Sequence, residues 1–161
     1  MFHQYPELSK YEYKTTQRIK DILTSYNIKM IDIPMETGLV AEIGQGEKCI
    51  AVRTDIDALP IQEQVSQDFT STNDEVMHAC GHDIHMASIL AIATKLKEEE
   101  EQLNGRVRFL FQPAEELGYG AKVMAKTNAL DDVQAIIGFH NYPTLDIGCL
   151  LYTSLSGLAR Q

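Results

Sequence analysis

The residues with the most distinctive chemistry lie within one eight-residue stretch, 78–85 (HACGHDIH). This stretch holds three of the five histidines and one of the three cysteines of the chain. Imidazole and thiolate groups are the ligands that zinc and similar divalent ions prefer. The apolar segment that follows, Met86 to Lys97, predicts a helix, and the N-terminus of a helix favours a thiolate. We therefore expect a metal site here, with Cys80 in the deprotonated form.

Such a site needs further donors, and two later segments offer them. Adjacent Glu115 and Glu116 follow a predicted strand and Pro113, and His140 follows another predicted strand. Asp57 likewise comes just past the end of a strand. In open α/β sheets, the carboxyl ends of the strands form the edge where ligands bind. We therefore expect these side chains to share one site.

Each of these signals has an alternative interpretation. A buried cysteine is often part of a hydrophobic core, and aspartates before a proline are common in turns. A pair of glutamates is favoured by the dipole of a first helical turn. A cysteine hydrolase that pairs Cys80 with His82 or His85 is a further alternative. Residues so close together in a tight turn form such a pair with difficulty, so the metal site is the favoured interpretation.

The two adjacent glutamates can divide the work of metal-assisted hydrolysis. One carboxylate binds the ion, while its neighbour takes a proton from a water molecule whose pKa the ion lowers towards about 7. The same carboxylic acid can then pass that proton to a leaving amine.

The hydrophobic pattern predicts alternating strands and helices. A capping box at 9–12 opens a first helix, which Asn27 ends. Residues 38–43 and 49–53 flank a glycine-containing loop and are predicted to pair as a hairpin. The other predicted elements are strands at 28–33, 106–111, 133–139 and 148–152, helices at 86–97 and 121–126, and a surface loop at 62–75. This order is typical of the α/β class, with a mixed, largely parallel sheet that helices cover on both faces.

Length and composition predict one soluble globular domain. The chain has 161 residues, of which 44% are hydrophobic and 23% are charged. A net charge of -9 argues against nucleic acid or an anionic membrane as partner. No apolar stretch approaches the roughly 20 residues of a spanning helix, and the first residues do not resemble a signal peptide. Three widely spaced cysteines do not suggest a disulfide framework, so we expect a cytoplasmic location.

The motifs together resemble the amidohydrolase branch of the aminoacylase/carboxypeptidase metallopeptidases. That branch includes hippurate hydrolases, indole-acetyl-amino-acid hydrolases and N-acetyl-diaminopimelate deacetylases. The matching stretches follow the family's order from residue 5 to about residue 150: 5–9 (YPELS), 37–41 (TGLVA), 53–61 (RTDIDALPI), 77–83 (MHACGHD), 111–116 (FQPAEE) and 138–140 (GFH).

The resemblance implies metal-dependent hydrolysis of the amide bond of N-acyl amino acids, which would be the small-molecule partner. Two divalent ions, zinc or manganese, are implied for the full enzyme. The family's metal ligands correspond to Cys80, His82, Glu116 and His140. Its general base corresponds to Glu115, and Asp57 resembles a carboxylate that orients a histidine ligand. We assign His78 and His85 to packing or substrate contact.

The resemblance also implies a domain organisation. Residues 1–151 correspond to the N-terminal part of a dinuclear metallopeptidase catalytic domain, and 152–161 depart from the family pattern. A lid and dimerisation domain and a C-terminal half with a further histidine ligand are absent, and the full-length form is expected to be a homodimer or a higher oligomer. We therefore expect a fragment or a truncated reading frame. It either hydrolyses N-acyl amino acids or binds metal without turnover.

Overall fold

The structure is a computed structural model that describes residues 1–142, 144–146 and 149. Five strands form one sheet in the order β1-β2-β4-β3-β5. Their bounds are β1 Lys29–Ile31, β2 Leu39–Gly44, β3 Cys49–Asp55, β4 Arg106–Gln112 and β5 Val133–Gly138. β3 is parallel to β4 and β5, whereas β2 is antiparallel to β1 and β4. The sheet is therefore mixed, as predicted. Apart from Cys149, the strand predicted at 148–152 lies outside the described residues.

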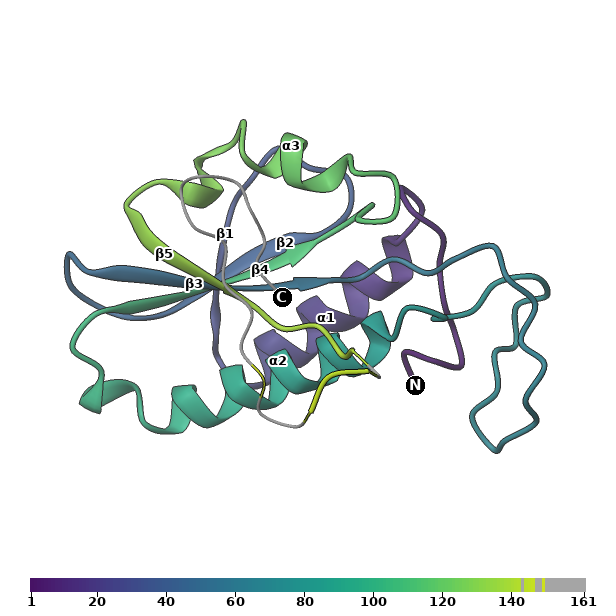
Figure 1. Cartoon of the computed structure of the whole chain (residues 1–161). Coiled ribbons are helices and arrows are strands. Elements are labelled where there is room, and N and C mark those ends of the chain that lie inside the picture. The colour runs from purple at the N-terminus through teal and green to yellow at the C-terminus, as the bar shows by residue number, and fades with distance from the viewer. Residues whose placement is uncertain (143, 147–148, 150–161) are drawn as a thin grey trace.

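Helices cover both faces of this sheet, which confirms the predicted class. α1 (Tyr13–Ser25) and α2 (His82–Glu98) lie on one face, and α3 (Gly120–Met124) lies on the other (Figure 1). Two 3-10 turns follow these helices: η1 (Glu100–Gln102) comes after α2, and η2 (Asn128–Leu130) comes after α3. Within the described residues, we find no helix with the length and apolar character that a membrane span requires.

α2 shows why the sequence forms this arrangement. It buries Met86, Ile89, Leu90 and Ala93, whose spacing of three and four residues places them on one helical face. This face packs with β2, β4 and α1 into the larger hydrophobic core. The helix begins at His82, four residues before the predicted start, and so includes part of the metal-ligand motif.

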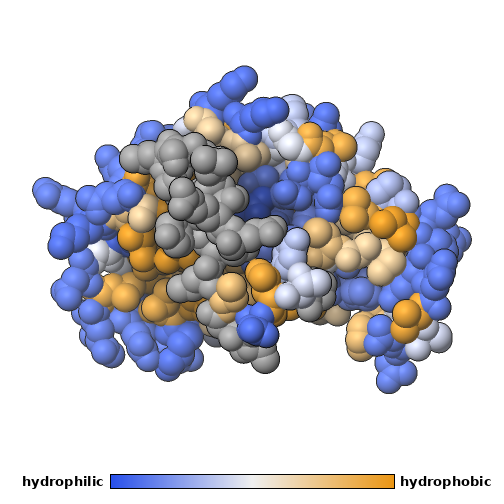
Figure 2. Space-filling view, viewed as in Figure 1, coloured by the Kyte–Doolittle hydropathy of each residue, from blue (hydrophilic) through white to orange (hydrophobic). Residues whose placement is uncertain are grey.

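β5 is the least covered strand of the described sheet. Hydrophobic side chains (orange in Figure 2) reach the surface there, and Ile136 and Ile137 are 52% and 57% exposed. β5 packs against the smaller core through its first residue, Val133, whereas β2, β3 and β4 each contribute fully buried apolar residues to the two cores. The carboxyl end of β5 nevertheless lies next to α2, because its parallel partner β3 fixes its register.

The hairpin predicted between residues 38–43 and 49–53 is wrong. β4 lies between these two strands, with Val40 opposite Leu110 and Val52 opposite Phe109. The strand is buried along nearly its whole length, and a strand that is buried on both faces belongs in the middle of a sheet. A short glycine-containing loop favours local pairing, but burial of β4 outweighs that preference.

The capping box predicted at 9–12 is also wrong. α1 begins at Tyr13, and the Glu12 side chain does not cap it. Instead, the carboxylate of Glu7 accepts the backbone N–H of Thr15 at 2.7 Å. The free N–H groups of the first turn are thus satisfied by a residue upstream of the predicted box.

Ser9 and Glu12 contact distant loops instead. The Ser9 hydroxyl donates to Asp57 Oδ2 at 2.7 Å, and Glu12 Oε1 accepts the backbone N–H of Ala114 at 2.7 Å. Both loops carry candidate site residues. The segment before α1 therefore contributes to the position of the candidate site.

The N-terminal segment also contacts the surface loop at 62–75, which projects from the body in Figure 1. His3 Nδ1 lies 2.9 Å from Asp83 Oδ2, and His3 Nε2 lies 3.0 Å from Glu63 Oε1. The edge of the His3 ring also contacts Phe69. One imidazole thus connects the N-terminus, this loop and the first turn of α2.

The environment of His3 predicts that the stability of the loop at 62–75 depends on pH. Burial lowers the pKa of His3, but the hydrogen bonds and charges of Glu63 and Asp83 outweigh burial and raise the pKa above 6.5. A raised folded-state pKa gives stability that is complete below the unfolded value and is lost as pH rises through the folded value. We expect amide exchange in 62–75 to accelerate as pH passes that point, beyond its intrinsic pH dependence. The His3→Gln variant should lose this step, and an identical step in the variant would contradict the assignment.

Candidate metal centre

The candidate residues follow the ends of the three parallel strands. In the register of the sheet, Asp55 at the end of β3 lies opposite Gln112 at the end of β4, and Gly138 ends β5 beside Arg53. Asp57, Glu115, Glu116 and His140 come just after these ends. α2 also begins at this edge, since Gly81 precedes its first residue with a left-handed φ of 81°. The predicted edge of the sheet is therefore where the candidate residues meet.

His82 is fully buried, and its environment fixes which ring nitrogen is free. Its Nδ1 lies 2.9 Å from the carbonyl oxygen of Asp57 and 3.2 Å from Asp57 Oδ1. Nδ1 therefore carries the proton, and Nε2 presents a lone pair. Around that nitrogen lie Asp55 Oδ2 at 3.6 Å, Glu116 Oε1 at 3.7 Å and Glu115 Oε2 at 3.9 Å.

On this side of the His82 ring, His82 Nε2 and Glu116 Oε1 are buried without a hydrogen-bond partner among the described residues. Leaving a buried polar group unsatisfied costs about 1–3 kcal/mol. Both atoms belong to a cluster with Cys80 Sγ in which the donor atoms lie within 4.8 Å of one another. Nitrogen, sulfur and carboxylate oxygen together suit zinc or a similar divalent ion. A cation among the three would satisfy both unpaired atoms, so these residues fit a metal ion.

His140 lies beside this cluster and is oriented in the same way. Its Nδ1 lies 2.7 Å from the carbonyl oxygen of Asn141, so its proton is used there. Its Nε2 faces Cys80 Sγ at 3.4 Å. The four side chains that the resemblance selected are thus brought together, although they span sixty residues of sequence.

The structure adds two residues to which sequence reasoning gave no metal-site role. Asp55 and His85 form a second donor group with His82 and His140, again within 4.8 Å. The two groups share His82. The spacing of three between His82 and His85 could have indicated this, because residues i and i+3 of a helix lie on one face. Asp55 is the last residue of β3, so its carboxylate lies at the same edge of the sheet as that of Asp57.

His78, by contrast, lies apart from both donor groups. It is 4% exposed, and burial lowers its pKa to about 4. Its two ring nitrogens have no hydrogen-bond partner within the described part of the chain. A neutral ring in the protein interior agrees with the predicted packing role.

The helix dipole that is predicted to favour a Cys80 thiolate is opposed by burial and by the neighbouring carboxylates. Burial, followed by the carboxylate of Glu116, raises the pKa of the Cys80 thiol to about 11. The nearby carboxylates outweigh the dipole, because a full negative charge acts on the sulfur more strongly than a partial positive one. A divalent cation in the cluster would reverse this balance and favour the thiolate.

Asp57 has contacts that suit a residue that orients His82. Burial raises its pKa, but the hydrogen bonds from His82 and Ser9 and from the backbone N–H of Glu116 outweigh burial and lower it. The same carboxylate thus joins the β3 end, α2 and the loop that carries Glu116. Removing it would affect two candidate ligands together.

Comparisons with known proteins identify relatives of this chain. Two Bacillus subtilis proteins described as N-acetylcysteine deacetylase and N-acetyl-L-cysteine deacetylase are 47% identical over 151 and 148 residues. These alignments cover 92% and 91% of this chain but 40% and 36% of the relatives. The crystal structure of a Bacillus subtilis dinuclear metal-binding peptidase of the M20 family superimposes with a TM-score of 0.87 at 48% identity. That alignment covers 89% of this chain and 41% of the other.

The chain thus spans about 40% of the length of the first curated relative it matches. The model of peptidase family M20/M25/M40 matches residues 51–152, which include the ends of all three parallel strands and the whole of α2. With the fold and the motif order in agreement, this chain belongs to the M20/M25/M40 peptidase family.

Proposed function

We propose that this chain is the metal-binding part of an amidohydrolase that cleaves the amide bond of N-acyl amino acids. The observation that carries the proposal is the pair of unpartnered buried atoms, His82 Nε2 and Glu116 Oε1, beside Cys80 and His140. The proposed ligands are these four residues. The names of the two Bacillus subtilis relatives support an N-acyl amino acid as the substrate.

Two ions are proposed because the donor atoms form two overlapping groups. One group contains Cys80, His82 and Glu116, and the other contains His82, His140 and Asp55, with His85 within the same distance of them. The structural relative is described as dinuclear, which supports the same number here. The nitrogen and sulfur donors favour zinc over magnesium or calcium. Manganese is the other ion that we propose.

Glu115 is the proposed general base. Its side chain is 37% exposed, whereas that of Glu116 is 22% exposed and keeps Oε1 buried. Glu115 can therefore reach a water molecule at the solvent side while Glu116 stays among the donors. A bound divalent ion would supply Lewis-acid polarisation of the scissile carbonyl and of a water molecule. The Glu115 carboxylate takes a proton from the attacking water and passes it to the leaving amine.

A cysteine nucleophile fits the site less well. A nucleophilic cysteine needs a depressed pKa, whereas burial and Glu116 raise the pKa of Cys80 to about 11. His140 Nε2 faces the sulfur, but among the described residues no carboxylate orients that ring, because its Nδ1 lies against the carbonyl oxygen of Asn141. The geometry thus favours a metal ligand over a nucleophile.

The proposal predicts that metal binding and stability are linked. Zinc that binds only the folded state at 100 times its Kd should stabilise the chain by about 2.7 kcal/mol. We expect an EDTA-treated sample to melt at a lower temperature, and Zn²⁺ or Mn²⁺ to restore the melting temperature. Any hydrolysis of N-acetyl amino acids should be lost and restored in parallel.

Two cysteine variants test whether Cys80 is a metal ligand, with Cys49 as the matched control. Cys80→Ala should lose most metal uptake, measured by elemental analysis after dialysis, whereas Cys49→Ala should keep it. Cys49 is buried at the start of β3, at the opposite end of the strand from the site. Equal metal uptake by the two variants would remove Cys80 from the ligand set. Metal uptake without any hydrolysis by this chain would limit its role to metal binding.

A further inference from the structure

His85 is fully buried beside the candidate metal centre, and its two ring nitrogens have different partners. Asp55 Oδ1 lies 2.6 Å from His85 Nδ1, and Arg53 Nη1 donates to Asp55 Oδ2 at 2.8 Å. Although burial raises the pKa of Asp55, the His85 hydrogen bond and the charges of His82 and Arg53 lower it. Because the Asp55 carboxylate accepts from Arg53 and lies against His85 Nδ1, that nitrogen carries the proton and Nε2 is an acceptor.

That acceptor binds the segment just after β5. The backbone N–H of Asn141 donates to His85 Nε2 at 3.0 Å, and the side-chain atom of Asn141 that contacts the same nitrogen is Oδ1. Because Nε2 already accepts the backbone N–H, we assign the amide the opposite orientation, in which Nδ2 donates to Nε2. On its other side, the amide abuts Gly81. A Cβ at Gly81 would lie 2.6 Å from Asn141 Oδ1 and 2.7 Å from Nδ2. Asn141 therefore occupies a slot between Gly81 and His85.

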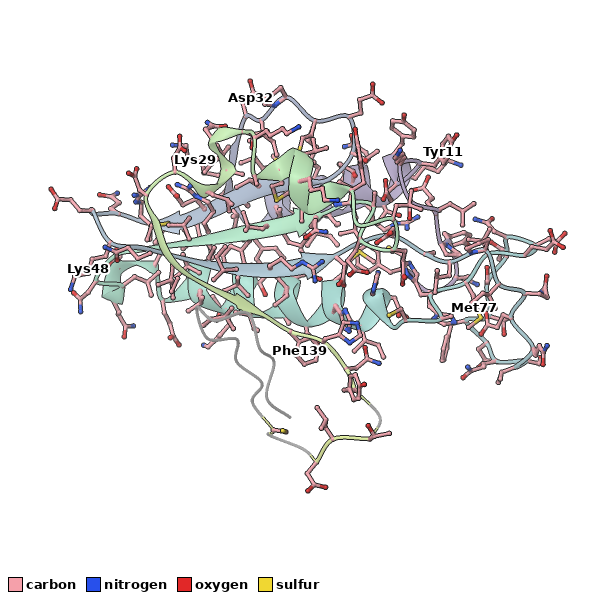
Figure 3. All side chains as sticks on the ribbon, turned by 45° about the horizontal axis from the view of Figure 1, so that its top comes forward. Tyr11, Lys29, Asp32, Lys48, Met77 and Phe139 are labelled. Carbon is pink, nitrogen blue, oxygen red and sulfur yellow. The ribbon has the colours of Figure 1, made fainter. Side chains whose placement is uncertain are left out.

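The carbonyl group of the same residue orients His140. The carbonyl oxygen of Asn141 lies 2.7 Å from His140 Nδ1, which leaves His140 Nε2 facing Cys80 Sγ at 3.4 Å. The rings of His85 and His140 lie 4.4 Å apart. Phe139, labelled in Figure 3 at the end of β5, lies beside the first turns of α2 with its ring 5.3 Å from that of His85.

We propose that His85 is a positioning residue that, through Asn141, aims His140 at the metal centre. Asp55 fixes the tautomer of His85, His85 Nε2 fixes the backbone of Asn141, and the carbonyl of Asn141 fixes the ring of His140. Sequence reasoning could not reach this chain of contacts, because His85 and Asn141 are 56 residues apart. The inference rests on the proposed metal site but not on the proposed reaction.

The alternative role for His85 is that of a metal ligand, since it belongs to the second donor group. The two roles make different demands on the side chain. A positioning residue needs a hydrogen-bond acceptor where Nε2 now lies, whereas a ligand needs an imidazole. Glutamine can place its carbonyl oxygen near the position of Nε2, and the shorter asparagine can only replace Nδ1.

The experiment compares His85→Gln with His85→Asn. In the metal-free protein, we expect exchange of the Asn141 amide hydrogen to be near that of the wild type in His85→Gln and much faster in His85→Asn. In zinc titrations followed by calorimetry, His85→Asn should weaken the binding step that needs His140 by about 10- to 100-fold, the usual effect of losing a group that orients a ligand. His85→Gln should change that affinity by less than about threefold.

A double variant separates positioning from general damage. If His85 acts only through His140, His85→Asn should weaken zinc binding no further in a His140→Ala background. Full additivity of the two effects would overturn the proposal, as would equal loss of zinc affinity in the Gln and Asn variants or unchanged exchange at Asn141. If the zinc and exchange results appear as expected but no amide is hydrolysed, the proposed reaction fails and the role of His85 stands.

Discussion

Glu115→Gln is expected to lower kcat for N-acyl amino acid hydrolysis by about 10³-fold, within the range for loss of a general acid–base group, while metal content stays unchanged. The substitution keeps the shape of the side chain but removes its ability to take a proton. The role is possible because Glu115 is the more exposed of the two glutamates and places Oε2 3.9 Å from His82 Nε2.

The measurement uses two proteins, because this chain spans about 40% of the length of its first curated relative. One is the 161-residue chain. The other is a chimera in which residues 1–142 replace the matching part of the Bacillus subtilis N-acetylcysteine deacetylase. Glu116→Gln should lose bound metal as well as turnover, and Glu101→Gln, on the exposed 3-10 turn η1, should lose neither. Full turnover by the Glu115→Gln chimera would remove Glu115 from the role of base.

Sequence could predict the edge of the sheet that carries the candidate site, because this inference needs only the ends of elements. Apolar runs fix where β3, β4 and β5 end, and parallel strands end at one edge. The positions of Asp57, Glu116 and His140 follow directly from those ends. The motif order supplied the assignment of roles, which strand ends alone do not give.

Contacts between distant segments could not be predicted from local patterns. Ser9 and Glu12 have the spacing of a capping box, yet both bind loops that lie 48 and 102 residues away. The position of β4 between β2 and β3 is another feature that local patterns do not reveal. The short loop between β2 and β3 predicts a hairpin, but the burial of β4 in the middle of the sheet outweighs that preference. The pKa of Cys80 depends on carboxylates whose proximity only the fold reveals.

Gly120→Ala is expected to be the most damaging single-methyl change near the site. An added Cβ would lie 1.6 Å from the carbonyl oxygen of Pro113, and the Gly120 N–H is hydrogen-bonded to the carbonyl of Ala114 at 3.2 Å. Ala114 already has a left-handed φ of 47°. Because the clash is with backbone, the turn itself must move, and this turn carries Glu115 and Glu116. Overpacking of this kind costs about 3 kcal/mol.

Gly138→Ala is the matched control, since no heavy atom of the described chain lies within 4 Å of an added Cβ there. At about 2–4 °C per kcal/mol for a chain of this size, Gly120→Ala should lower Tm by roughly 6–12 °C. Gly138→Ala should leave Tm within about 2 °C of the wild type, because alanine costs no more than glycine in a strand. Zinc affinity should fall only in Gly120→Ala, since Glu116 shares the displaced turn. An unchanged Tm and zinc affinity in Gly120→Ala would mean that residues 113–120 can adjust without moving Glu116, and that this turn does not hold the metal ligand in place.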